Sequence, residues 1–504
     1  MTKPAETGPI PVREKSVRSL LWVSSIQLLQ GALFFAVPTL LANVTGAAEI
    51  GMAEICLAVF SVSILFIELG TGPAIIRKPD LNQKFLSTVF FVNLATGLLF
   101  CGGLFFGAPL LTRLLKMNPQ LVRFLRWLAV SFIFFALAIV QRNLLARRLA
   151  FRRIAIVNAI AAIVAVTVIA IVIMHSRPLD ALITGLMCFA FVGSFGFWIA
   201  SGWRPSLEFE PRQLGPLLRF SLSVSASSVL GNLATQWERF LISGLLGPAE
   251  LGYYTLARNL HLTPIRHLMK VSDTILLPGL SMIQKDKAQC RRYYTTALRF
   301  EFLLLGPLVV FIALYAADLV PLFYGRSWNR VVPLIYLTIL ATFRNITAHT
   351  VGAVFLSQGR ADVQLKWVIW SILLLSGYAL IGYPWGIEGI AVAVSLLGFF
   401  GWGLSHYMAN RLIDLSFRDF LRPLLLPIGL SLLLVLLMWP VSLLLRLWIP
   451  QLVWIRIGLG ALLLGGLNVL ILRILSPSLG SALWAIVREA SGISGSISER
   501  NRTE

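Results

Sequence analysis

Charged residues stand inside an apolar stretch of the sequence that runs from Trp237 to Asp273. The second half of this stretch is expected to be a helix that begins near Glu250. Along that helix the further charged residues are Arg258, Arg266, Lys270 and Asp273. At about 100° per residue, they fall within an arc of roughly 120° on one side of the helix. Because a charge at the bilayer centre costs at least about 2.5–3.5 kcal/mol, that side is expected to line a pathway for a solute.

Arginine could bind an anion inside such a pathway, because its guanidinium group grips phosphate oxygens in bidentate fashion. Counting 1.5 Å per residue from the expected outer end of each helix places Arg258 about 12 Å, Arg344 about 18 Å and Arg266 about 24 Å deep. Arg239 lies nearer the outer side, on the preceding helix. These four arginines are the predicted substrate-binding residues of a central cavity. For Arg239, a structural ion pair is an equal alternative.

Acidic residues within apolar segments could bind a coupling cation. Glu54 lies about 9 Å along its helix, and Glu238 directly precedes Arg239. Both are candidate ligands for H⁺ or Na⁺, and no other cofactor or metal is expected; for Glu54, an ion pair with a cavity arginine is the alternative. A lone intramembrane histidine such as His261 is expected to be a hydrogen-bonded packing residue. Four further residues lie near the expected cytoplasmic boundary, where they could reach water or pair with a loop: Lys270, Asp273, Glu301 and Glu68.

The composition predicts an integral membrane protein. The chain has 504 residues, of which 57% are hydrophobic and 13% charged, and its mean hydropathy is +0.82. Ordinary soluble domains do not approach these values. The formal net charge of +21 does not indicate nucleic-acid binding, because the basic residues stand in short clusters between apolar runs. The four cysteines lie far apart, without the spacing of a metal site.

A helix needs about 20 apolar residues to cross the hydrocarbon core, and the sequence contains about 14 segments of that length. They centre on residues 20–43, 49–70, 86–110, 121–144, 154–174, 180–201, 217–246, 250–280, 295–316, 332–356, 364–383, 387–409, 421–445 and 452–473. The expected fold is therefore an all-α polytopic membrane protein. Lys and Arg concentrate in every second loop between these spans, beginning with the N-terminal segment, so both termini are predicted to be cytoplasmic.

The chain also repeats a turn sequence. Residues 43–54, NVTGAAEIGMAE, align without a gap with residues 244–255, GLLGPAELGYYT. The identical pairs are Gly46 with Gly247, Ala48 with Ala249, Glu49 with Glu250, and Gly51 with Gly252. Six spans separate the copies, an even number, so the two halves have the same orientation and the substrate site is expected between them.

This repeat predicts two six-helix bundles in parallel, followed by two C-terminal helices. The expected segments are a cytoplasmic N-terminal segment (1–17), an N-terminal six-helix lobe (18–203), a C-terminal six-helix lobe (204–410), the two further helices (411–475) and a cytoplasmic tail (476–504).

Local sequences resemble the polysaccharide flippases of the O-antigen and exopolysaccharide type, within the multidrug/oligosaccharidyl-lipid/polysaccharide exporter superfamily. Residues 46–100 look like the second and third helices of these proteins, including ELGTGPAIIRK (68–78) and the following LST (86–88). Residues 144–158 and 246–260 resemble the family at a cytoplasmic crossing and at the start of the second half. The similarity covers almost all of residues 15–410, whereas the last two helices agree in number only.

The resemblance implies a transporter that flips a polyprenyl-diphosphate-linked oligosaccharide across the bacterial inner membrane by alternating access, for O-antigen or exopolysaccharide biosynthesis. Its implied partners are this lipid-linked oligosaccharide, membrane lipids, and the polysaccharide polymerase with its chain-length machinery. A small-molecule or multidrug exporter of the same superfamily is the alternative, although such a cleft should carry more acidic residues. An enzyme is not expected, because no nucleophile–base pair or phosphate-binding glycine loop occurs in the sequence.

Overall fold

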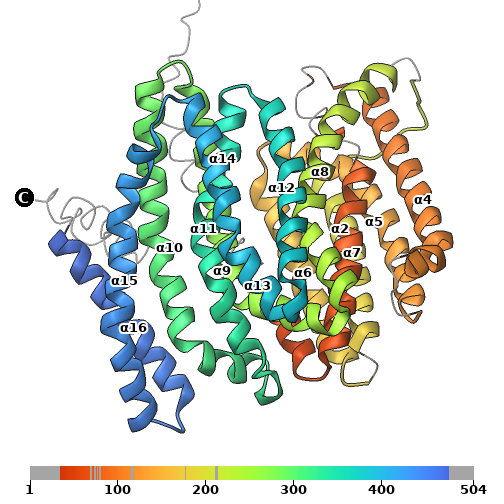
Figure 1. The fold of residues 1–504 in the computed structure, drawn as a ribbon. Helices are drawn as coiled ribbons and strands as arrows, with labels where there is room; N and C mark the ends of the chain where they lie inside the picture. Colours follow the sequence, from red (N-terminus) through yellow and green to blue (C-terminus); the bar gives the residue numbers. More distant parts are fainter. Residues whose placement is uncertain are drawn as a thin grey trace, which may run out of the picture.

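The computed structural model describes residues 35–68, 71–72, 75, 78, 81–114, 119–175, 178–210 and 214–475, and within this part it contains helices and no strand (Figure 1). Residues 35–42 are helical. The longer helices are α2 (Ala47–Glu68), α4 (Gln83–Leu114), α5 (Leu121–Arg147), α6 (Phe151–Val172), α7 (Pro178–Ser201), α8 (Leu214–Leu246), α9 (Pro248–Met282), α10 (Lys287–Phe323), α11 (Val331–Ser357), α12 (Ala361–Gly382), α13 (Gly386–Leu396), α14 (Gly398–Leu412), α15 (Phe417–Trp448) and α16 (Val453–Leu475).

The predicted all-α polytopic membrane fold is confirmed, and every predicted span from 49–70 onward overlaps a helix. Most of the first span, 20–43, lies outside the described residues, as do the predicted segments 1–17 and 476–504. Within the described chain, 10 stretches are long and apolar enough to cross a membrane by length and composition. Neither α8 nor α9 is among them, so the number of about 14 spans remains a prediction, as do the lobe boundaries.

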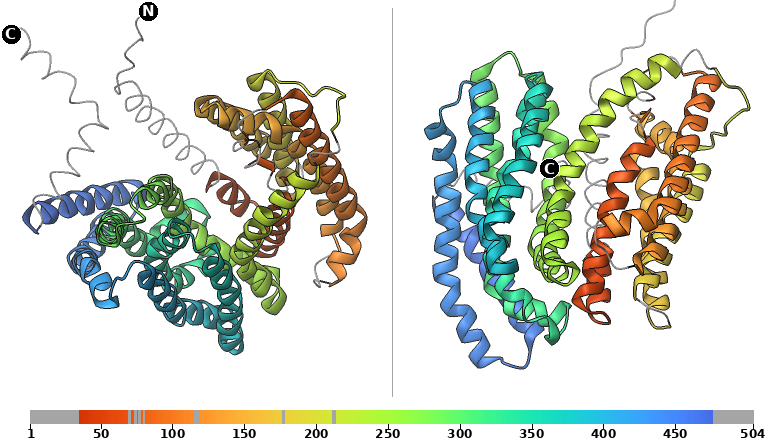
Figure 2. Two further views of the ribbon diagram at one scale, coloured as in Figure 1. Left: turned by 90° about the horizontal axis from the view of Figure 1, so that it is seen from above. Right: turned by 45° about the vertical axis from the view of Figure 1, so that its right-hand side comes forward.

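The helices form two lobes that lie side by side (Figure 2). The N-lobe consists of α2 and α4–α7, in which α4 packs on α5, and α7 packs on both α5 and α6. The C-lobe consists of α8–α14, with α11 packed between α9, α10 and α13. Between the lobes, α2 packs against α8 and α9. The interface is therefore built from the helices that contain or flank the two copies of the repeated turn sequence, namely α2, α8 and α9.

The two copies of that turn meet face to face. A Cβ atom placed on Gly51 would collide with the backbone oxygen of Pro248, and one placed on Gly252 would collide with the backbone oxygen of Ala47. In the alignment of the repeats, Ala47 and Pro248 are equivalent positions. The contact of Gly51 with Pro248 therefore has an equivalent contact in the other half, that of Gly252 with Ala47. This reciprocity is what a two-fold axis between parallel repeats requires.

Further contacts close the lobes together at this end of the molecule. The indole Nε1 of Trp328 donates to the backbone oxygen of Ala42 at 2.8 Å, and the amide Nδ2 of Asn43 donates to that of Phe323 at 2.9 Å. Close by, the guanidinium of Arg330 donates to both carboxylate oxygens of Glu250 at 2.8 and 3.0 Å. These hydrogen bonds to Glu250 raise the pKa of Arg330 above its ordinary value, so the guanidinium remains charged.

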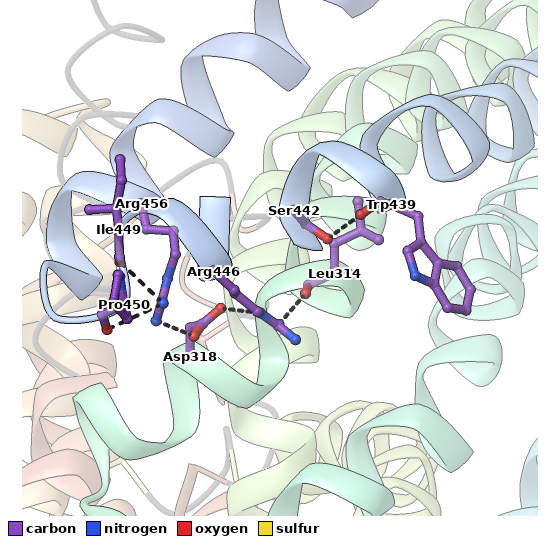
Figure 3. Close-up of polar contacts among 8 residues, drawn as sticks. All are labelled: Leu314, Asp318, Trp439, Ser442, Arg446, Ile449, Pro450 and Arg456. Carbon is purple, nitrogen blue, oxygen red and sulfur yellow. Dashed lines mark hydrogen bonds and ion pairs between the residues drawn. The ribbon is translucent and has the colours of Figure 1, made fainter. Parts of the chain in front are cut away.

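The C-terminal helices α15 and α16 lie at the edge of the molecule, beside α10 (Figure 1). A buried ion cluster joins all three helices (Figure 3). Asp318 on α10 accepts from Nε of Arg446 on α15 at 3.1 Å and from Nη2 of Arg456 on α16 at 2.6 Å. Small residues permit close approach as well, because a Cβ on Gly460 would collide with the Tyr315 ring. The ion cluster and this close packing therefore hold α15 and α16 against α10 of the C-lobe.

Candidate functional site

A cavity of about 370 Å³ lies within the C-lobe, between α8, α9, α11, α12 and α14. Four of the six predicted site residues line it, namely Arg258, Arg266, Arg344 and Glu238. We call it the arginine cavity. Three guanidinium groups face one carboxylate there, which leaves a formal excess of two positive charges among the described lining residues. Arg258 and Arg266, which belong to the helical arc predicted for α9, both line this cavity.

Arg258 is held by the acidic residue of the cavity. Its guanidinium forms an ion pair with the carboxylate of Glu238, which also accepts a hydrogen bond from the hydroxyl of Tyr254. The guanidinium of Arg258 lies 5.7 Å from the centre of the Tyr254 ring, within range of a cation–π contact. Glu238 is only 8% exposed. Arg258 is therefore placed by two neighbours before any ligand binds.

Arg344 reaches the cavity from α11 and is placed by backbone contacts. Its Nη1 donates to the backbone oxygen of Val394 at 3.1 Å. The guanidinium also lies against Gly398, where a Cβ atom would overlap it. Gly398 stands at the start of α14, so a residue distant in sequence provides the space that Arg344 occupies.

Arg266 differs from the other two arginines because its side chain is exposed. It lines the arginine cavity, and no ion pair of Arg266 occurs with the described residues. A guanidinium with five donors and no carboxylate partner can accept a phosphate without first releasing another group. Of the three cavity arginines, Arg266 is therefore the one most available to an anionic ligand.

The arginine cavity also contains residues that the sequence did not single out for it. Both ring nitrogens of His261 are within hydrogen-bond distance of hydroxyls, Nε2 at 2.9 Å from Thr338 and Nδ1 at 2.7 Å from Thr342. His261 is 2% exposed, so both ring nitrogens are taken up by protein hydroxyls in the cavity wall. Aromatic side chains complete the wall, namely Tyr254, Trp367, Tyr378 and Trp402. Uncharged aromatic residues in apolar helices carry no sequence signal that separates cavity-lining from lipid-facing positions.

A second cavity, of about 410 Å³, lies at the interface of the lobes, and we call it the interface cavity. The other two predicted residues, Glu54 and Arg239, line it. The carboxylate of Glu54 lies 3.0 Å from Nε of Arg239, so the ion pair considered as an alternative for both residues is present. Three amide or hydroxyl side chains from the C-lobe add polar groups to the wall, namely Gln236, Asn259 and Thr263.

The expectation for Glu301 was wrong. Glu301 was expected to reach water or a loop at the cytoplasmic boundary, but it is 4% exposed and lies in the interior of the C-lobe. It accepts a hydrogen bond from Ser272, and its Oε1 lies 3.4 Å from Nε2 of His349. Distance along α10 did not reveal which face of that helix Glu301 occupies. The side chains of Lys270 and Asp273 lie outside the described part of the structure.

Comparisons with known proteins agree with this architecture. The family described as "Polysaccharide biosynthesis protein" matches residues 40–333. The lipopolysaccharide biosynthesis protein WzxC of Escherichia coli (strain K12) is 23% identical over 426 residues, which are 84% of this chain and 86% of WzxC. The teichuronic acid biosynthesis protein TuaB of Bacillus subtilis (strain 168) is 20% identical over 370 residues, 72% of this chain and 76% of TuaB.

Among solved structures, the lipid II flippase MurJ in an inward closed conformation superposes with a TM-score of 0.71 at 15% identity, covering 91% of this chain and 99% of that chain. At this identity the similarity concerns the fold, which is that of a multi-pass membrane protein. The family match extends over more than half of the sequence and includes the repeated turns, α8, α9 and three of the charged residues of the arginine cavity, namely Glu238, Arg258 and Arg266. Arg344 and the lining residues of α12 and α14 follow the matched range. The chain therefore belongs to the polysaccharide biosynthesis protein family, as its resemblance to polysaccharide flippases had indicated.

Proposed function

We propose that this protein flips a polyprenyl-diphosphate-linked oligosaccharide across the bacterial inner membrane, for O-antigen or exopolysaccharide biosynthesis. The observation that carries the proposal is the arginine cavity, where Arg258, Arg266 and Arg344 outnumber the single carboxylate of Glu238. The relatives WzxC and TuaB are named for lipopolysaccharide and teichuronic acid biosynthesis, which supports a polysaccharide precursor as the cargo. The name of the structural neighbour, a lipid II flippase, supports transport of a lipid-linked molecule.

The physical barrier to this transport is the polar head of the lipid. Sugar hydroxyls and two phosphates would have to cross about 30 Å of hydrocarbon without hydrogen bonds, at several kcal/mol for each unsatisfied group. A polar cavity open to the bilayer removes that barrier while the polyprenyl tail remains in lipid. The protein then needs no covalent step, and we propose that it acts as a transporter and not as an enzyme.

Alternating access would proceed by rocking of the N-lobe against the C-lobe. The structure is closed at the end where the Gly51 and Gly252 turns meet, which the distribution of basic loops predicts to be the outer end. In this orientation both termini are cytoplasmic and the cargo enters from the cytoplasm. Opening the outer end requires the glycine contact to part, together with the Glu54–Arg239 ion pair.

Glu54 and Glu238 are the proposed sites of cation coupling. Each carboxylate is now held by an arginine, Arg239 or Arg258 respectively. The phosphate of the cargo and the carboxylate compete for the same guanidinium. A phosphate that binds Arg239 or Arg258 would therefore free the carboxylate of Glu54 or Glu238 to bind H⁺ or Na⁺. Cargo binding and cation binding would then occur together. The proposed partners after release are the polysaccharide polymerase and its chain-length machinery, which use the flipped precursor.

The alternative is export of a small molecule or drug by the same fold. A cavity for cationic drugs should carry excess negative charge, and the arginine cavity carries the opposite sign among its described residues. An anionic cargo is therefore favoured.

The test is deletion of the gene, followed by extraction and mass analysis of polyprenyl-diphosphate oligosaccharides from each leaflet of the inner membrane. The flippase function predicts that one lipid-linked glycan accumulates on the cytoplasmic side. Complementation with Arg258→Ala or Arg344→Ala should fail to restore export although the variant inserts in the membrane. An unchanged lipid pool with altered sensitivity to small toxic compounds would favour the drug exporter instead.

A further inference from the structure

A third cavity lies inside the N-lobe, between α2, α5, α6 and α7, and contains none of the predicted site residues. Its volume is about 260 Å³. Its polar lining residues are Glu68, Arg142, Asn143, Asn158 and Ser194, and its aromatic ones are Phe135, Phe189 and Phe197. We call it the N-lobe cavity. Glu68 was expected to reach water or a loop, and the structure places it in this cavity wall.

The polar groups of the N-lobe cavity retain capacity for a ligand. The Nδ2 of Asn143 donates to the backbone oxygen of Ile139 at 2.9 Å, which leaves its carbonyl oxygen and one N–H. Glu68, Arg142 and Asn158 make no side-chain hydrogen bond or ion pair with the described residues. Polar groups inside a membrane protein that lack protein partners are expected to face water or a cargo.

The chemistry of this cavity differs from that of the arginine cavity. Glu68 and Arg142 have opposite charges, so the described lining is formally neutral, whereas the arginine cavity has an excess of two positive charges. Amides offer both donors and acceptors, as sugar hydroxyls do. Apolar ring faces of phenylalanine suit the C–H face of a sugar ring, and the Phe135 and Phe189 centroids lie 6.5 Å apart. These groups match a neutral carbohydrate better than a phosphate.

The N-lobe cavity adjoins the proposed transport route. Phe135 and Phe189 line both the N-lobe cavity and the interface cavity, where Glu54 and Arg239 lie. On the C-lobe side of that interface, the adjacent residue Glu238 lines the arginine cavity. The N-lobe cavity thus borders the interface cavity through two shared phenylalanines, and the arginine cavity borders it at the neighbouring residues Glu238 and Arg239 of α8. The cargo that the proposed function requires has two parts, a diphosphate and a glycan.

We propose that the N-lobe cavity is a glycan subsite, which binds a sugar ring of the lipid-linked oligosaccharide while its diphosphate lies in the arginine cavity. This inference rests on the proposed function. Typical small-molecule pockets measure roughly 300–1,000 Å³, so a cavity of about 260 Å³ holds only a short part of a glycan. Specificity for the sugar would then depend on N-lobe residues, and affinity for the diphosphate on C-lobe residues.

The experiment measures binding of two probes to the purified full-length protein in detergent. One probe is farnesyl diphosphate, which has a diphosphate and no sugar. The other is the polyprenyl-diphosphate oligosaccharide fraction extracted from a strain that lacks this gene. Asn158→Ala should weaken binding of the oligosaccharide probe roughly three- to tenfold, the effect of losing one or two hydrogen bonds, and leave farnesyl diphosphate unchanged. Arg344→Ala should weaken binding of both.

Two further variants make the result decisive. Phe135→Leu keeps an apolar side chain and removes the ring, so it should reproduce the selective loss if Asn158→Ala proves unstable. Asn329→Ala, at an exposed residue that lines none of the three cavities, should bind both probes as the wild type does. Wild-type affinity of both N-lobe variants for both probes would overturn the glycan subsite alone. A wild-type protein that binds neither probe would overturn the proposed function and the subsite together.

Discussion

The carboxylate of Glu54, on α2 of the N-lobe, lies 3.0 Å from Nε of Arg239, on α8 of the C-lobe. It is the only ion pair that joins the two lobes within the described part of the chain. The neighbouring pair, Glu238 with Arg258, lies wholly inside the C-lobe and need not break when the lobes move. The adjacent residues Glu238 and Arg239 of α8 thus form different kinds of ion pair: Glu238 pairs within the C-lobe, and Arg239 pairs across the lobe interface.

Glu54→Gln is expected to favour separation of the lobes, because the amide keeps the shape of the side chain and removes its charge. Disulfide cross-linking between cysteines placed at the exposed positions Val44 and Ser327 measures closure. Their neighbours Asn43 and Gly325 lie against each other across the lobe contact. The cross-linked fraction should fall in Glu54→Gln, in a background without the four native cysteines. Equal cross-linking with and without the substitution would show that the ion pair does not hold the lobes together.

The glycine pair gives a steric test of the same closure. Gly51→Ala would place a methyl group on the backbone oxygen of Pro248. Because this oxygen belongs to the backbone of a helix, it cannot move aside as the end of a flexible side chain can. Overpacking of this kind costs about 1–3 kcal/mol, so the closed state should be destabilised and the Val44–Ser327 cross-link reduced. Gly244→Ala, on an exposed helical glycine with nothing within 4 Å of its Cβ, is the matched control and should cross-link normally. Similar yields from both variants would contradict the reciprocal glycine contact.

The sequence predicted the interface of the lobes better than their interiors. Glu49 with Glu250 and Gly51 with Gly252 recur at a fixed spacing, and such a repeat predicts a symmetric contact without any knowledge of distances. Charged residues in apolar helices were likewise informative, because lipid penalises them, and Arg258, Arg266, Arg344 and Glu238 were found around one cavity.

The remaining features depend on packing between segments that are distant in sequence. Glu301 was misplaced because its distance from a helix end says nothing about the neighbours it meets, here Ser272 and His349. Asn158 and Phe135 belong to separate helices of the N-lobe, and neither residue type is unusual in an apolar span. A cavity formed by such residues becomes visible only when the helices are assembled.

The ion cluster of the C-terminal helices predicts a stability effect. Asp318→Asn would remove the carboxylate shared by Arg446 and Arg456, and Arg456 is 6% exposed. Breaking a buried pair in this way typically costs about 3–5 kcal/mol, because a charge remains buried without its partner. Thermal unfolding in detergent should therefore begin at a lower temperature. Asp362→Asn, at a pair whose side chains are about half exposed, is the control and should unfold like the wild type. An unchanged unfolding temperature for Asp318→Asn would mean that apolar packing alone holds α15 and α16.

Gly398 offers a test of Arg344 that leaves the arginine itself in place. A methyl group at position 398 would occupy the space of the Arg344 guanidinium, which sits at the end of a flexible side chain and can move. The fold should therefore survive Gly398→Ala, while the guanidinium loses its position beside Val394. Because a misplaced charged group stabilises an anion less well, affinity for farnesyl diphosphate and glycan export should both fall. Gly403→Ala on the same helix, where a Cβ would meet nothing within 4 Å, should leave both at wild-type levels. If the two alanine variants transport equally well, the position of Arg344 in this structure is not the one that binds the cargo.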